Sequence, residues 1–168
     1  MDAADLESLY RIHGPGLLRY LARQFRHAAA PEDLLHETFV QALRQPEGLA
    51  AAVSHRAWLF GIARKLGLAA VRGRRRQVLA PLPDVAAPAA EVDERVVAMR
   101  QAIAALPTHL RQTMELRLGE ELTYEEIATV LAIPVGTVRS RLHAALRELR
   151  QRLIAPSDIE CPKREGVR

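Results

Sequence analysis

Three prolines fall within eight positions near the middle of this 168-residue chain, at Pro81, Pro83 and Pro88. Proline fixes φ and removes a backbone hydrogen-bond donor, so this stretch cannot form a stable helix. The stretch is also acidic, because residues 81–97 carry four acidic side chains and one basic side chain. We therefore expect a flexible linker at residues 80–97, with one folded unit on either side of it.

Both flanking regions have the composition of helical proteins. Alanine and leucine together make up 52 of the 168 residues, and both favour helix. The scarcity of Val, Ile and Thr argues against a sandwich or a barrel. Apolar residues recur at helical spacing on each side of the linker. The sequence therefore predicts an all-α fold with two small helical domains, at residues 1–79 and 98–154, and a flexible tail at residues 155–168.

Start and stop signals divide the first domain into helices. Gly14-Pro15-Gly16 is expected to interrupt the first one. Pro31, followed by two acidic residues, is typical of a helix start, where the dipole favours negative charge. Ser54 is a suitable N-cap for a later helix, which runs into the basic segment at residues 72–76.

The second domain carries the signature of a helix-turn-helix. Thr123 and Glu126 have the spacing of a capping box, which predicts a short helix that Pro134 then ends. A longer helix follows, and its expected core stripe is Val138, Leu142, Leu146, Leu149 and Leu153. Two such helices joined by a tight turn form the motif whose second helix enters the major groove of DNA.

Polar side chains gather on the outward face of that longer helix. At 100° per residue they lie opposite or beside Val138, and no acidic residue interrupts them before Glu148. Their donors suit base edges and phosphates. An ordinary solvated helix face is the alternative, but the capping box and the turn favour DNA binding. The candidate DNA-contacting residues are Thr137, Arg139, Ser140, Arg141, His143 and Arg147.

Two segments of the second domain, residues 122–128 and 133–142, resemble the promoter −35 reader of bacterial sigma factors. More narrowly, the chain resembles the extracytoplasmic-function (ECF) group, because Leu106-Pro107 and residues 116–118 also match the pattern of that group. The chain departs from the pattern at Ala144, where many members carry a second basic residue.

Residues 32–40, which read EDLLHETFV, resemble the helix with which this family docks on the clamp helices of the largest RNA polymerase subunit. The residues at i, i+3, i+4 and i+7 of this segment share one helix face, and they are Asp33, His36, Glu37 and Val40. Without the resemblance, the same residues also fit the solvated, acidic start of a helix. The resemblance implies that the polymerase-binding residues are Asp33, His36, Glu37, Phe39 and Val40.

Residues 58–64, which read WLFGIAR, resemble the family's −10 element reader. Aromatic rings can stack on bases while cations hold phosphates. The apolar spacing alone predicts that Trp58 packs in the core, and the arginines alone fit a solvated helix end. Lys65 and Ala69 replace the Asn and Asp of the family pattern. The candidate −10 residues are Trp58, Phe60, Arg64, Lys65, Arg72, Arg74, Arg75 and Arg76.

The resemblance implies a factor that directs promoter-specific transcription initiation, with core RNA polymerase, promoter DNA and an anti-sigma factor as partners. No enzyme motif, cofactor motif or metal-ligand spacing is present in the sequence, so we expect neither catalysis nor a metal or cofactor. The single cysteine, Cys161, excludes a disulfide framework within the chain. No apolar run approaches a membrane span, and the N-terminus is acidic, so we expect a cytoplasmic protein with no membrane insertion.

Two other functions remain open. Lys65, Ala69 and Ala144 also fit a sigma-like decoy that sequesters an anti-sigma factor without initiating transcription. A one-component helix-turn-helix regulator, with a ligand-sensing N-terminal half, is the second alternative. Binding of core polymerase by residues 1–79 argues against the regulator, and run-off transcription argues against the decoy.

Overall fold

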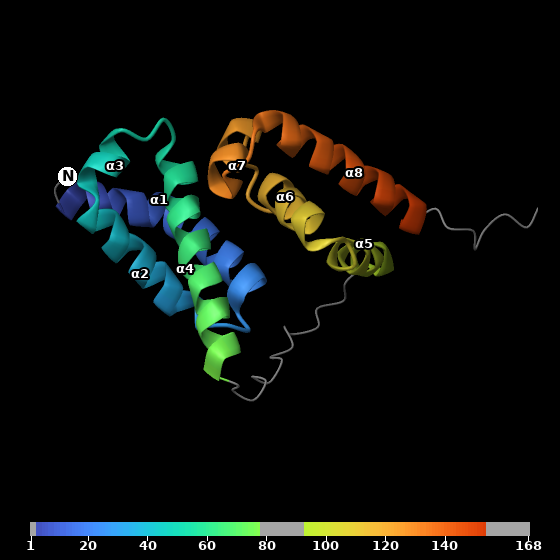
Figure 1. The fold of residues 1–168 in the computed structure, drawn as a ribbon, viewed down its shortest axis with the longest axis horizontal. Coiled ribbons are helices and arrows are strands. Elements are labelled where there is room, and N and C mark those ends of the chain that lie inside the picture. The colour runs from blue at the N-terminus through green and yellow to red at the C-terminus, as the bar shows by residue number, and fades with distance from the viewer. Residues whose placement is uncertain (1–2, 78–92, 154–168) are drawn as a thin grey trace, which may run out of the picture.

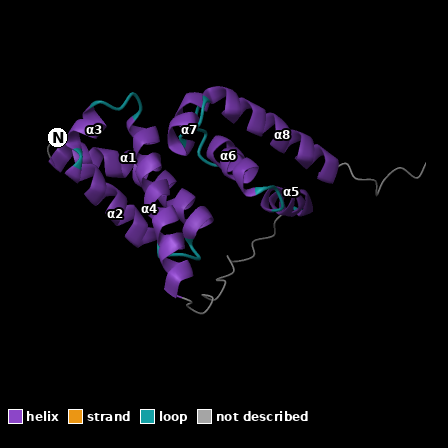
Figure 2. Ribbon diagram, in the orientation of Figure 1, coloured by secondary structure: helices purple, strands orange, loops and turns teal. Residues whose placement is uncertain are grey.

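The computed structural model describes residues 3–77 and 93–153, and every regular element in these ranges is an α-helix (Figures 1 and 2). The all-α prediction is confirmed. The tail at residues 155–168 and most of the predicted linker lie outside the described residues. The helices are α1 (Ala3–Phe25), α2 (Pro31–Arg44), α3 (Pro46–Ala50), α4 (His55–Gln77), α5 (Glu94–Ala104), α6 (Thr108–Leu118), α7 (Tyr124–Leu131) and α8 (Val135–Leu153).

The first unit consists of α1, α2 and α4 packed against one another, with the short α3 beside α2 (Figure 1). Helix α1 continues through Gly14-Pro15-Gly16, so the predicted interruption is wrong. Proline removes one backbone donor from a helix. Packing outweighs that loss here, because the side chains of Leu17 and Leu21, on the next turns of the same helix, are completely buried.

The predicted starts of α2 and α4 are confirmed. Pro31 occupies the first turn of α2. The Ser54 hydroxyl caps α4 by accepting a hydrogen bond from the backbone N–H of Ala57 at 3.1 Å. Sequence reasoning did not identify α3. The second unit also begins earlier than predicted, because Asp93 caps α5 and residues 94–97 are helical rather than part of the linker.

The second unit is built around the predicted helix-turn-helix of α7 and α8. The Thr123 hydroxyl accepts a hydrogen bond from the Glu126 N–H at 3.2 Å, and the Glu126 carboxylate accepts one from the Thr123 N–H at 2.9 Å. This reciprocal pair is the expected capping box. Ala132 ends α7 with φ at 54°, in the left-handed region, just before Pro134.

The core stripe of α8 differs from the prediction. Val138, Leu142 and Leu149 are buried as expected, but the third position of the stripe is Ala145 and not Leu146. At 100° per residue, Ala145 lies about 20° from Val138 around the helix axis, whereas Leu146 lies about 80° away. Leu146 and Leu153 are accordingly exposed, by 49% and 41%. Along α5, Val96 and Met99 are likewise exposed, and only Ala102 is buried.

The two units lie against each other. Helix α7 packs on α4, with α8 on the far side of α7 (Figure 1). Buried apolar residues from both units form one continuous cluster. The arrangement is therefore closed, although the sequence suggests two independent domains.

Two glycines of α4 provide a matched test of this packing. A Cβ added at Gly67 would collide with the ring of Phe25, which is itself buried, whereas a Cβ at Gly61 meets nothing within 4 Å. We expect Gly67→Ala to lower the free energy of unfolding by about 1–3 kcal/mol. Gly61→Ala should raise it by about 0.5–1 kcal/mol, because alanine favours helix. Urea unfolding followed by circular dichroism measures both, and equal stabilities would contradict the packing.

Candidate functional site

The outward face of α8 presents its polar side chains to solvent. Four of the six residues predicted to contact DNA are exposed, and the other two are half-buried. In the first two turns of the helix, the Ser140 hydroxyl donates a hydrogen bond to the Thr137 carbonyl at 3.0 Å. Ala144 is half-buried and packs against the core. The exposed residues are Arg139, Ser140, His143 and Arg147, and the half-buried ones are Thr137 and Arg141.

The predicted −10 residues lie on more than one face of α4. Trp58, Lys65, Arg72 and Arg76 are spaced by seven, seven and four residues, so they share one face. On this face Lys65, Arg72 and Arg76 are exposed. Trp58 is half-buried, with its indole next to Gly48, which agrees with the expectation of a packed ring.

Phe60 lies on a different face of α4 and is buried. Its ring centroid is 5.3 Å from that of Tyr20. The Arg56 guanidinium lies 5.9 Å from the same centroid. With 1% of its surface exposed, Phe60 cannot stack on a base in the closed arrangement. Arg64, one turn further along α4, is half-buried, and its Nε has no hydrogen-bond partner among the described residues.

The basic end of α4 combines two roles. Arg74 donates a hydrogen bond to the backbone carbonyl of His27, so it ties α4 to the turn that follows α1. Arg72, Arg75 and Arg76 are exposed. The predicted phosphate clamp therefore retains three solvent-facing guanidinium groups, while Arg74 has a structural contact.

Four of the five predicted polymerase-binding residues lie on one accessible face of α2. Asp33 and His36 are exposed, and Glu37 and Val40 are half-buried. The Glu37 carboxylate accepts a hydrogen bond from Gln41 at 2.8 Å. Phe39 is the exception, because it is buried with its ring 4.9 Å from that of Tyr10. Phe39 therefore holds α2 in place and is not accessible to a partner.

The two units are joined through a carboxylate that sequence reasoning missed. Glu120, in the turn between α6 and α7, has a completely buried side chain. Arg23 of α1 donates to one of its oxygens, and Arg19 lies 3.3 Å from the other. Burial raises the pKa of the Glu120 carboxyl, and the charges of Arg23 and Arg19 offset part of that rise. No sequence pattern distinguishes this acid from Glu121, the exposed acid next to it in the same turn.

A second polar contact joins the N-termini of α4 and α7. The Ser54 hydroxyl donates to the Glu126 carboxylate at 2.7 Å, so the cap of one helix bonds to the capping box of the other. Burial raises the pKa of Glu126, but hydrogen bonds from Thr123 and Ser54 outweigh it, and the net pKa lies below the ordinary value. The ionised carboxylate is thus the form that the contact stabilises.

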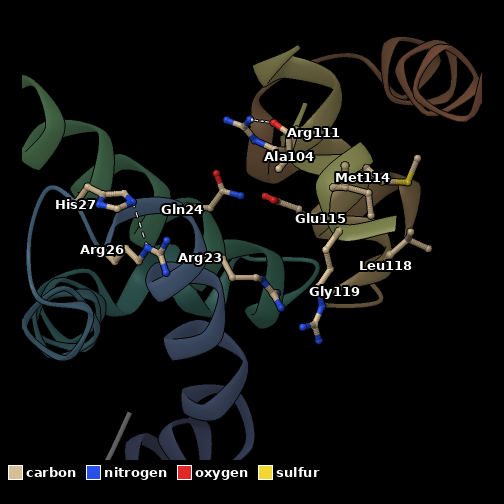
Figure 3. A pocket seen from close by; sticks show the side chains of 12 residues that line it. Arg23, Gln24, Arg26, His27, Ala104, Arg111, Met114, Glu115, Leu118 and Gly119 are labelled. Atoms are coloured by element: carbon tan, nitrogen blue, oxygen red, sulfur yellow. Dashed lines mark hydrogen bonds between the residues drawn. The ribbon is translucent and has the colours of Figure 1, made fainter. Parts of the chain in front are cut away.

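A cleft of about 800 Å³ lies between the C-terminal half of α1 and helices α5 and α6 (Figure 3). Its lining includes four arginines, one histidine and several apolar residues, and Glu115 is its one acidic residue. Burial raises the pKa of Glu115, and the positive charges of Arg111 and Arg23 offset part of that rise. The lining residues are Arg23, Gln24, Arg26, His27, Arg100, Ile103, Ala104, Arg111, Met114, Glu115, Leu118 and Gly119.

Residues 3–77 and 93–153 contain no group of three or more His, Cys, Asp or Glu residues placed to hold a metal ion. None of the helices in these ranges is long and apolar enough to cross a membrane.

Comparisons with known proteins place both units in one family. The family model for sigma-70 region 2 matches residues 9–77, and that for sigma-70 region 4 matches residues 97–149. The ECF RNA polymerase sigma factor SigL of Mycobacterium tuberculosis is 34% identical over 157 residues, which cover 89% of each chain. The RNA polymerase sigma factor YlaC of Bacillus subtilis is 30% identical over 172 residues, covering 93% of this chain and 96% of that one.

Solved structures show the same fold. The sigma factor RpoE of Bartonella quintana, in complex with the anti-sigma factor NepR, matches with a TM-score of 0.72 and 22% identity, over 89% of this chain and 97% of that chain. CnrH in complex with the cytosolic domain of CnrY matches with a TM-score of 0.66 and 24% identity, over 93% and 92%.

Replacing Glu126 with Gln tests the charge at the junction of α4 and α7. Because the folded pKa of Glu126 lies below the ordinary 4.5, its ionised form stabilises the fold above that pH, and this contribution is lost as the pH falls through the folded pKa. We expect wild type to exceed E126Q in unfolding free energy by about 1 kcal/mol at neutral pH. Urea unfolding at decreasing pH should show that difference shrinking below pH 4.5.

The matched control is E125Q, since Glu125 is exposed in the same helical turn. It should match wild type at neutral pH within a few tenths of a kcal/mol, the range of a screened dipole interaction. A difference between wild type and E126Q that does not change with pH would contradict the assignment.

Proposed function

The chain belongs to the ECF group of RNA polymerase sigma factors, and we propose that its two helical units divide promoter recognition between them. A member of this family directs promoter-specific transcription initiation with core RNA polymerase. We assign docking and the −10 element to the unit of α1–α4, and the −35 element to the unit of α5–α8. The observation that carries this assignment is the outward face of α8, which presents donors to solvent directly after a capped α7.

In the −35 unit, α8 is the helix that enters the major groove. Arg139 and Ser140, in its first two turns, are exposed and can reach base edges. Arg147 lies two turns beyond Arg139 and is suited to a backbone phosphate. Ala144 supplies no donor, so the base contacts fall to the residues around it.

In the −10 unit, the face of α4 that carries Lys65, Arg72 and Arg76 follows the phosphates of the separated strand. A lysine ammonium offers donors only, so Lys65 can hold a phosphate but cannot read a base as an amide would. The half-buried ring of Trp58 lies at the start of this face. Phe60 is buried against Tyr20 of the same unit, so the stacking role is not assigned to it in this arrangement.

Docking on core polymerase is assigned to the open face of α2. Asp33, His36 and Glu37 form a largely acidic surface there, which complements a basic coiled-coil partner. Core polymerase supplies the catalytic chemistry of transcription, so this chain needs no active site of its own. The same role places the chain in the cytoplasm, where the DNA is.

An anti-sigma factor is the second protein partner that we propose. The basic cleft between α1 and the α5–α6 pair combines arginines with apolar residues such as Ile103 and Met114. Charge complementarity favours an acidic, amphipathic segment in this cleft. Such a segment would touch both units and hold them in the closed arrangement.

A sigma-like decoy is the second candidate function. It is favoured by Lys65 and by the exposed Ala69, which lack the Asn and Asp of the family pattern. A decoy would bind the anti-sigma factor without initiating transcription. Run-off transcription with core polymerase therefore separates the two functions, because a decoy yields no transcript on any promoter.

Arg139→Ala tests the −35 assignment. If Arg139 reads a base, its loss should cost about 1–3 kcal/mol of discrimination between the intact −35 element and a scrambled one. Initiation by reconstituted holoenzyme on the two promoters measures this. Arg152→Ala is the control, because Arg152 lies in the last turn of α8 beside Glu148. Unchanged discrimination in R139A would rule out the proposed face.

A double variant, R72Q/R76Q, tests the phosphate role of α4. Each phosphate contact on a single strand adds about 0.7 to the slope of log affinity against log salt, so the slope should fall by about 1.4. Holoenzyme binding to a promoter fork with an unpaired −10 strand measures it. Arg95→Gln, at an exposed position in the first turn of α5, should leave the slope unchanged. An unaltered slope in R72Q/R76Q would exclude these contacts.

A further inference from the structure

The cleft between α1 and the α5–α6 pair carries an excess of positive charge. Arg100 of α5 and Arg111 of α6 line it, and Arg26 and His27 line it from the end of α1 and the turn that follows. With Arg23, four arginines stand against one acidic residue. Such an excess in a concave site attracts anions, because the walls of a cleft exclude water and focus the field.

Two of the arginines keep donors available for a ligand. Arg100 is exposed, and no hydrogen bond or ion pair joins it to another residue of the described ranges. Arg111 donates through one nitrogen to the Ala104 carbonyl at 2.7 Å, which positions its guanidinium and leaves further N–H groups. Guanidinium groups pair with phosphate oxygens through parallel hydrogen bonds. A diphosphate, with several charges and acceptor oxygens, suits these two side chains better than a single carboxylate does.

The cleft also contains an acceptor without a partner. The Glu115 side chain points from α6 towards Gln24 of α1 (Figure 3). Its Oε2 is buried, and no donor among the described residues bonds to it. Buried polar oxygens in proteins are normally hydrogen-bonded, so this oxygen calls for a donor. Because no hydrogen bond from the described ranges fixes the carboxylate, it can rotate towards a donor that a ligand brings into the cleft.

Apolar side chains surround this acceptor. Met114 and Leu118 flank Glu115 on α6, and Ile103 lines the cleft from α5. Thioether and branched side chains pack well against a flat ring. Arg111 lies one helical turn from Glu115, about 6 Å along the axis of α6. The volume of about 800 Å³ lies in the range of about 300–1,000 Å³ that is usual for small-molecule sites.

We propose that this cleft binds a guanine nucleotide with a diphosphate or longer phosphate chain. Arg100 and Arg111 hold the phosphates, the apolar side chains cover the ring, and Glu115 accepts hydrogen bonds from the base. Guanine presents two adjacent N–H donors, at N1 and N2, whereas adenine presents an acceptor next to its one amino group. A carboxylate accepts hydrogen bonds and therefore favours guanine.

The nucleotide and the acidic segment of an anti-sigma factor would use the same arginines, so each excludes the other from the cleft. The concentration of the nucleotide would then determine how much of the chain the anti-sigma factor can hold. This regulatory meaning rests on the proposed function, whereas nucleotide binding by the free chain does not.

Calorimetric titration of the purified full chain with GDP, ADP and inorganic pyrophosphate tests the site. We expect GDP to bind about tenfold or more tightly than ADP or pyrophosphate, because only guanine supplies paired donors to a charged acceptor. No binding of GDP would overturn the proposal. Equal affinity for the three ligands would indicate general attraction of anions and would also overturn it. Neither result would affect transcription by the holoenzyme, so the proposed function is tested separately.

Arg100→Gln tests the phosphate contact at an exposed position, where the substitution leaves the fold intact. Affinity for GDP and for pyrophosphate should fall together, by about tenfold, because both ligands lose a charge-assisted hydrogen bond. Arg95→Gln is the matched control, since Arg95 is exposed on the same helix but does not line the cleft. Equal losses in R100Q and R95Q would overturn the site.

Glu115→Gln separates recognition of the base from attraction of the phosphates. The variant keeps the size of the side chain and removes its negative charge, so pyrophosphate should bind at least as tightly as it does to wild type. The preference for GDP over ADP should fall to within about twofold, because the amide offers one acceptor instead of two. Retained pyrophosphate binding also shows that the variant is folded. An unchanged preference for GDP would overturn the role of Glu115.

Discussion

Burial of the Glu120 carboxylate between the two helical units determines how the rest of this molecule is arranged. A carboxylate without access to water is tolerated only where charged donors surround it. Here the donors are Arg19 and Arg23 from the opposite unit, so the side chain of Glu120 fixes the position of α1 relative to the turn between α6 and α7. The capping contact of Ser54 with Glu126 fixes α4 against α7 in the same way.

This arrangement gives the two surfaces that we propose for DNA reading different accessibility. The proposed −35 face of α8 is exposed to solvent. Helix α4, the proposed −10 helix, carries exposed cations on one face and the buried Phe60 on another, so only part of it is available in the closed chain. A partner that binds only one arrangement of the two units would shift the population of the chain towards that arrangement.

Local chemistry could be predicted from the sequence, whereas contacts between distant segments could not. The capping box of Thr123 and Glu126 follows from short-range hydrogen bonding and was found as predicted. The continuity of α1 through Pro15 depends on packing that outweighs a local helix breaker. A smaller error is the prediction that Leu146 is buried. Residues spaced by four drift around the helix axis, so Leu146 is exposed. The role of Glu120 depends on arginines about a hundred residues away, and no periodicity reports such a pair.

We propose that this chain confers promoter specificity on core RNA polymerase through two separate contacts with DNA. Transcription of genomic DNA from the source organism by core polymerase, with and without the purified chain, tests this when the 5′ ends of the transcripts are sequenced. We expect new 5′ ends that share two upstream sequence blocks at a fixed spacing and that appear only when the chain is added. A stable complex with core polymerase that produces no specific 5′ ends would contradict it.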